Sequence, residues 1–276
     1  NNKDFKVKNG IKPAAYQEAV GTATSGSVAV GYDLSVAAYD SVEFSIVSQD
    51  TSPRGMSFNN DGTKMYIIGN SSNTVYQYSL STGFNLSTAS YDSVSFSVSS
   101  QESSSQDLAF NNDGTKMYIV GSGSNTVYQY SLSTGFNLST ASYDSVSFSA
   151  ASQEGSVRGM TFKSDGTKMY VTGALNDSVY QYSLSTAFDI STATYDNESF
   201  SLASQTTAPN GITFSDNGTK LYMVTGSGDK VFQYSTGSTL ATATLDLSTG
   251  SVFEVTPTAN TQVSLSNPAA SGTVSS

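Results

Sequence analysis

The chain has 276 residues and a formal net charge of −10, so a basic surface for nucleic acid is not expected. It contains no His and no Cys, which excludes His-based catalytic triads, thiol nucleophiles and disulfides. No apolar run approaches the roughly 18 residues that a membrane-spanning helix needs, so we expect no membrane insertion. Charged residues make up only 12%, and the abundance of Tyr, Phe, Thr and Val favours an all-β fold.

Residues 1–30 precede the repetitive part of the chain and do not match it. We expect them to form an arm that attaches the protein to its partners or to further copies of itself. The next residues match only the last part of the unit that is repeated downstream. Within them, Ser41–Val47 has the period-two alternation of a strand with one buried face. The repetitive part therefore begins with an isolated fourth strand.

The first complete unit predicts four strands. Gly55–Phe58 is short and apolar, and the Asn-Asn-Asp-Gly sequence after it suits a hairpin turn that needs a positive φ. Lys64–Ile68 and Val75–Leu80 follow, separated by a loop rich in Gly, Ser and Asn. A longer loop leads to Val94–Val98, in which alternate residues are apolar.

The unit recurs with a constant period of 52 residues, marked by the turn glycines Gly62, Gly114, Gly166 and Gly218. Four strands in a unit of about this length are typical of β-propeller blades, whose apolar faces are covered by their neighbours. The last unit stops after its third strand, Val231–Tyr234. We therefore predict a four-bladed propeller at residues 31–238, closed by Ser41–Val47 pairing beside Val231–Tyr234. Two chains that share one larger ring are the alternative.

Residues 239–276 depart from the repeat. We interpret them as the start of a β-rich segment, and we expect the natural chain to continue beyond Ser276. The predicted organisation is thus an N-terminal arm, a propeller of circularly offset repeats and a C-terminal β-rich segment.

The units resemble the YVTN-type propeller repeat. The resemblance rests on Gly55–Phe58, Asp61–Ile67 and Thr74–Tyr78 and their copies, and it covers residues 31–238. The blades of that family are usually shorter, and the extra residues here fall in the loop before the fourth strand. The family includes lactonase-like enzymes as well as surface and binding proteins, so the resemblance implies a propeller without deciding its function.

The two flanks carry a second resemblance. Asn2–Gly10 is similar to the opening of phage tail-fibre proteins, and Leu245–Pro257 is similar to a segment of marine phage structural proteins. This implies a structural protein of a virion: a tail fibre, appendage or decoration protein with the propeller as an adhesive or spacer module. Its partners would be other virion proteins, copies of itself and a host-surface glycan or receptor.

Two other functions remain open. A bacterial secreted or cell-surface adhesin would use the same propeller. A lactonase-like hydrolase would need carboxylate pairs, and no local motif supplies one. We predict that the protein is not an enzyme and needs no cofactor.

The loops from each fourth strand to the next first strand supply the candidate ligand site, because in a propeller they gather near the central axis. Each carries a glutamine, followed by acids or arginines in several units. The candidate ring comprises Gln49, Asp50, Arg54, Gln101, Glu102, Gln106, Gln153, Glu154, Arg158, Gln205 and Asn210. A small polar ligand such as a sugar, or a cation, would suit such a ring. Alternatively, the glutamines bridge adjacent blades and the charges pair with one another.

Other recurring residues have simpler interpretations. Asp61, Asp113 and Asp165 each offer one carboxylate per turn, too few for calcium, so we interpret them as hairpin turns and predict no metal site. The strand tyrosines are expected in the core or between blades. The loops between second and third strands are rich in Ser, Asn and Gly, which suits glycan binding and plain exposed turns equally.

Overall fold

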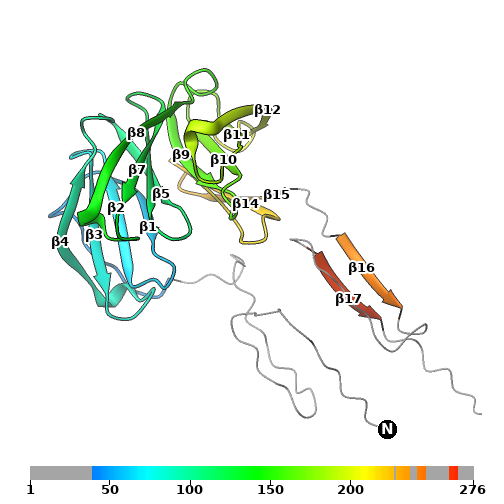
Figure 1. The fold of residues 1–276 in the computed structure, drawn as a ribbon, viewed down its shortest axis with the longest axis horizontal. Helices are drawn as coiled ribbons and strands as arrows, with labels where there is room; N and C mark the ends of the chain where they lie inside the picture. The colour runs from blue at the N-terminus through cyan, green and yellow to red at the C-terminus, as the bar shows by residue number, and fades with distance from the viewer. Residues whose placement is uncertain (1–38, 227, 237–240, 247–260, 267–276) are drawn as a thin grey trace, which may run out of the picture. The chain divides into compact units, whose positions relative to one another are not determined.

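The computed structural model describes residues 39–226, 228–236, 241–246 and 261–266. Four antiparallel sheets, which we call blades 1 to 4, follow one another along the chain, each built from one 52-residue unit (Figure 1). The blades consist of β1 (Pro53–Phe58), β2 (Lys64–Gly69), β3 (Thr74–Leu80) and β4 (Ala89–Ser97); β5 (Ser105–Phe110), β6 (Lys116–Gly121), β7 (Thr126–Leu132) and β8 (Ala141–Ser149); β9 (Val157–Phe162), β10 (Lys168–Gly173), β11 (Ser178–Leu184) and β12 (Ala193–Ser201); and β13 (Pro209–Phe214), β14 (Lys220–Thr225) and β15 (Val231–Ser235). The predicted all-β propeller blades are confirmed.

The turn between the first and second strands is the hairpin that the sequence indicates. Gly62 has φ 70°, a left-handed value that costs glycine little. A Cβ at Gly62 would lie 2.4 Å from the ring of Phe84, so a side chain has no room there. Asp61 accepts hydrogen bonds from the backbone N–H of Thr63 at 2.9 Å and from its hydroxyl at 2.6 Å. The carboxylate therefore serves the turn.

The fourth strand begins earlier than predicted, at Ala89 instead of Val94. A short 3-10 helix, η2 (Leu86–Thr88), precedes it, and its counterparts in blades 2 and 3 are η3 (Leu138–Thr140) and η4 (Ile190–Thr192). The register between β3 and β4 shifts at a bulge. At the bulge Ser93 has φ 58°. The bulge interrupts the alternation of side chains, which is why the sequence pattern did not reveal the first half of this strand.

The bulge places a carboxylate beside a lysine inside each complete blade. Asp92 accepts hydrogen bonds from Lys64 Nζ and from Gln77 Nε2, both at 2.8 Å. Burial alone would raise the pKa of Asp92, but the hydrogen bonds from Lys64, Ser79 and Gln77 outweigh it and lower the pKa. The same ion pairs recur as Lys116–Asp144 and Lys168–Asp196.

Consecutive blades pack through two apolar faces. We call the face of a blade that meets the following blade its rear face, and the opposite one its front face. Ile68 and Val75, on the rear face of blade 1, lie in one buried cluster with Leu108 and Met117 on the front face of blade 2. The strand tyrosines largely lie in these cores as predicted: Tyr66, Tyr78, Tyr118, Tyr130 and Tyr182 are fully buried.

Polar contacts also join the blades. Gln77 accepts a hydrogen bond from the backbone N–H of Leu138 in blade 2 at 2.9 Å, and Gln129 accepts one from Ile190 in blade 3 at 3.2 Å. The hydroxyl of Tyr66 donates to the carbonyl of Phe136. The glutamines of the third strands therefore bridge consecutive blades.

The predicted closure within one chain is not found. Among the residues that the structure describes, blade 4 has three strands and Ser41–Val47 belongs to no sheet. The first strands lie against one another from β1 to β5, β9 and β13, whereas β13 and β1, both fully described, share no comparable contact. Phe44 instead packs on Tyr78 of blade 1. The predicted pairing of these two segments was wrong, because blades 4 and 1 do not share the first-strand contact that neighbouring blades have.

Beyond the blades, β16 (Ala241–Asp246) and β17 (Thr261–Ser266) pair in parallel. The remainder of the predicted segment 239–276, the arm 1–30 and residues 31–38 lie outside the described residues. No helix in the part of the chain that the structure describes is long and apolar enough to cross a membrane.

The inter-blade glutamines can be tested by substitution. Gln129→Leu should lower the free energy of unfolding by about 1–3 kcal/mol, because it leaves the buried N–H of Ile190 without an acceptor. Gln101→Leu is the matched control, since within the described part of the chain the Gln101 side chain has one long contact, of 3.5 Å, with the hydroxyl of Tyr130. Urea unfolding followed by circular dichroism measures both. Equal losses in the two variants would contradict the bridging role.

Candidate functional site

The acids of the predicted ring are enclosed by their own blades. Glu102 is fully buried and accepts hydrogen bonds from Ser104 N at 2.8 Å, Gly123 N at 2.9 Å and the hydroxyl of Ser124 at 2.6 Å. These donors come from the loop that carries Glu102 and from the loop between β6 and β7. The carboxylate therefore ties two loops of blade 2 together.

Two further acids repeat this arrangement. Asp50, which is 3% exposed, accepts from the hydroxyls of Ser71 and Ser72 at 2.5 and 2.6 Å. Burial alone would raise the pKa of Asp50, but the hydrogen bonds from both serines outweigh it and lower the pKa. Glu154 is fully buried and accepts from the backbone N–H groups of Leu175 and Asn176. In these three blades the acid is a loop clamp.

The other ring residues are spread over several environments. Gln101 and Gln153 accept from the hydroxyls of Tyr130 and Tyr182 at 3.5 and 3.4 Å. The backbone N–H groups of Gln49 and Gln205 donate to Ile46 and Leu202 at the turns before blades 1 and 4. Gln106 Nε2 reaches the hydroxyls of Ser104 and Ser122, each at 3.3 Å. Arg54 is exposed.

The structure does bring one predicted pair together across blades. Nη1 of Arg158 lies 3.5 Å from the side-chain oxygen of Asn210. Both residues are on first strands, β9 and β13. Ligand binding by the ring as a whole stays a prediction, since the acids that would have attracted a cation are committed to loop contacts.

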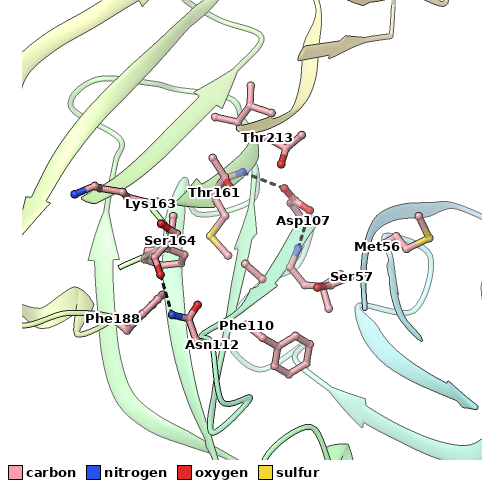
Figure 2. A pocket seen from close by; sticks show the side chains of 15 residues that line it. Met56, Ser57, Asp107, Phe110, Asn112, Thr161, Lys163, Ser164, Phe188 and Thr213 are labelled. Atoms are coloured by element: carbon pink, nitrogen blue, oxygen red, sulfur yellow. Dashed lines mark hydrogen bonds between the residues drawn. The ribbon is translucent and has the colours of Figure 1, made fainter. Parts of the chain in front are cut away.

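A second candidate lies where the first strands converge. A cavity of about 280 Å³ is lined by residues of β1, β5, β9 and β13 and of the adjoining turns (Figure 2). Its polar side chains include Ser57, Asp107, Thr161, Lys163 and Thr213. Asp107 is the one carboxylate among the described residues that line it. Hydroxyls, an amine and a carboxylate suit a hydroxyl-rich ligand.

Asp107 is held by two backbone groups. Its carboxylate accepts hydrogen bonds from Leu108 N at 2.9 Å and from Met160 N of blade 3 at 3.0 Å. Its carboxylate is surrounded by protein, although the residue as a whole is only partly buried and lines the cavity. Burial raises the pKa of Asp107 to about 7, and the two backbone hydrogen bonds only partly oppose this. The group can therefore exist in either protonation state near neutral pH.

The sequence analysis missed Asp107, although a signal was present. The equivalent positions of the other blades are Gly55, Gly159 and Gly211. A Cβ at Gly55 would lie 2.7 Å from Cα of Asp107, which shows how closely the first strands approach. An acid at a position otherwise held by glycine was the departure to notice.

No metal centre emerges from the described residues, which contain no group of three or more Asp, Glu, His or Cys able to hold an ion. The single carboxylate of the cavity also differs from the acid pair that glycoside hydrolysis uses. The titratable side chains that line the cavity are the carboxylate of Asp107 and the amine of Lys163.

Comparisons with known proteins reach only the level of fold. No family model and no curated protein matches the chain. Solved structures that resemble it include candidate 6-phosphogluconolactonases from Bacteroides fragilis (TM-score 0.49, 14% identity, 66% of this chain and 50% of that chain) and Bacteroides uniformis (0.45, 17%, 66% and 52%). The β-propeller domain of Cps50 from Myceliophteria thermophila is a third (0.43, 7%, 66% and 53%). The chain spans about half the length of these structures, and such distant likenesses say nothing of activity.

The loop-clamp role of Glu102 predicts a large effect on stability. Glu102→Ala should lower the free energy of unfolding by about 2–4 kcal/mol, because several buried donors lose their acceptor. Glu198→Ala is the control, since Glu198 is exposed and should change stability by less than about 0.5 kcal/mol. Chemical denaturation measures both. An unchanged midpoint for Glu102→Ala would show that the carboxylate is available for a ligand.

The raised pKa of Asp107 predicts a pH dependence. Its folded value of about 7 exceeds the reference value of 3.8, so the unfolded chain binds fewer protons and stability falls as pH rises from about 4 to about 7. Between pH 5 and pH 8 the loss should be about 2 kcal/mol, after allowance for exposure to the cavity. Asp107→Asn should remove this loss.

The measurement is urea unfolding at both pH values, and the absence of His leaves few other groups to titrate there. Asp113→Asn, in an exposed turn, should leave the difference between pH 5 and pH 8 unchanged. A wild-type protein that is equally stable at both values would contradict the raised pKa.

Proposed function

We propose that the chain is a non-catalytic structural and adhesive protein of a phage virion, with the propeller blades displayed on a fibre, appendage or decoration. One observation carries the non-catalytic part: the acids of the predicted ring are bound up in loop clamps, and the cavity offers a lone carboxylate. A hydrolase would need a second acid or an activated nucleophile within reach of the first. The virion part rests on the resemblance of Asn2–Gly10 and Leu245–Pro257 to virion proteins.

The adhesive part of the proposal rests on surface chemistry. The loops between second and third strands carry Ser, Asn and Gly, and the cavity adds the hydroxyls of Ser57, Thr161 and Thr213. These neutral groups both donate and accept hydrogen bonds, which suits the neutral hydroxyl groups of a glycan. We therefore propose a host-surface glycan as the ligand.

Immunogold electron microscopy of particles and cells from the source culture tests the location. Antibodies raised against the chain should label the fibre or surface of phage particles. Label confined to bacterial cell envelopes, with none on particles, would instead assign the chain to a bacterial adhesin.

A glycan array probed with the whole chain tests the ligand. We expect binding to a small set of glycans, and Thr213→Val should weaken it about tenfold, which is the loss of one useful hydrogen bond. Thr82→Val, in an exposed loop outside the cavity, is the control and should bind as the wild type does. Binding that Thr213→Val leaves intact would move the site away from the cavity, and no binding to any glycan would argue for a spacer.

A further inference from the structure

The first described residues, 39–47, correspond in the repeat to a fourth strand but pair with no strand in the structure. Ser41 has φ 58°, the left-handed value that also marks the bulge of the fourth strand in the three complete blades. Phe44 contacts Tyr78 edge-on with ring centroids 5.6 Å apart, just as Phe96 of β4 contacts Tyr130 of the next blade at 5.5 Å. The segment thus has the shape of a fourth strand and the packing of one, without strand neighbours.

Blade 4 is incomplete in the complementary way. No strand among the described residues pairs with the outer edge of β15. Val231 on this strand is 54% exposed, whereas its counterparts in blades 1 and 2 are fully buried. Lys220 keeps its hydrogen bond to Ser235 at 2.9 Å, but no carboxylate of the described residues meets it as one does in each complete blade.

The repeat identifies the missing partner residue by residue. Asp40 precedes Asp92 by one period of 52 residues, and Lys220 follows Lys64 by three, or 156. Asp40 is therefore the counterpart of the acid that Lys220 lacks. The register Thr74↔Ser97 of blade 1 likewise places Ser45 opposite Lys230.

We propose that a second copy of this chain supplies the missing strand, with its residues 39–47 pairing along β15 in a head-to-tail contact. Residues 39–47 remain packed on blade 1 of their own copy through Phe44. In the proposed ring, this blade 1 lies next to blade 4 of the other copy. Two such contacts close a two-fold ring of eight blades, four from each copy. Strand addition of this kind satisfies an exposed sheet edge.

The way in which consecutive blades pack favours a second copy over the chain's own segment as the partner of β15. The junctions between blades repeat the same aromatic contact, with ring centroids 5.5, 5.0 and 5.3 Å apart. After these three steps β13 and β1 share no contact comparable to that between neighbouring first strands, so we infer that the ring needs further blades. A second copy would supply these blades while the packing between consecutive blades stays the same.

The apolar faces at the two ends also match. Met56 on the front face of blade 1 is 58% exposed, whereas Leu108 and Met160 at the same position are each 3% exposed because a preceding blade covers them. On the rear face of blade 4, Val224 and Val231 are 44% and 54% exposed. Head-to-tail docking covers both faces, as every internal junction does.

Engineered cysteines test the contact directly, because the chain has none of its own. Ser45→Cys and Lys230→Cys variants, carrying tags of different size, are mixed as whole chains and oxidised. A disulfide between the two variants is expected, and light scattering should give a mass of about twice 28.9 kDa for the wild type. Ser97→Cys mixed with Lys230→Cys is the control and should not crosslink, since Ser97 pairs within its own blade.

A charge exchange separates the contact from simple loss of folding. Lys220→Asp alone should weaken association at least about tenfold, and adding Asp40→Lys in the same chain should restore it. Lys163→Asp, in an exposed turn where Lys163 pairs with Asp165, is the matched control and should associate normally. A monomeric wild type would overturn the proposal, and so would a Ser45→Cys/Lys230→Cys chain that forms its disulfide within one molecule.

Discussion

The structure depends on the need of every blade to have both apolar faces covered. Ile68 and Val75 at the rear of blade 1 are buried in one cluster with residues of blade 2 that include Leu108 and Met117. Burying such a side chain is worth about 1.5–3 kcal/mol, and each junction contains several. A blade by itself would lack this contribution. The exposed Val231 and Met56 are the places where the series of junctions stops.

In each of the three complete blades, a glutamine of the third strand contacts the carboxylate of the internal ion pair. In blade 1 the bulge turns Asp92 toward Lys64, and Gln77 donates to the same carboxylate. The oxygen of Gln77 accepts from Leu138 in the next blade. Gln77 thus connects the ion pair inside blade 1 to the contact with blade 2. The position of the ion pair and the distance between the two blades are therefore coupled.

This use of polar residues limits the chemistry that remains. Acids that a reader of the sequence would assign to a channel mouth hold loops together, as Glu102 does with its buried carboxylate. Asp107 is different, because it replaces a glycine at the closest approach of the first strands and faces a cavity. The proposed ligand site therefore lies where one blade departs from the pattern of the others.

The sequence by itself determined the period, the number of blades, the turns and the buried tyrosines, because each depends on local alternation or on a glycine at a fixed offset. It indicated the strands well but not the start of β4, since the bulge at Ser93 breaks the alternation. Only the tertiary structure decided that the ring acids are loop clamps, that Asp107 lines a cavity and that Ser41–Val47 does not pair with β15. These three features depend on distances between loops and between blades. Such distances are set by how side chains pack at each junction, and they produce no periodic pattern in the sequence.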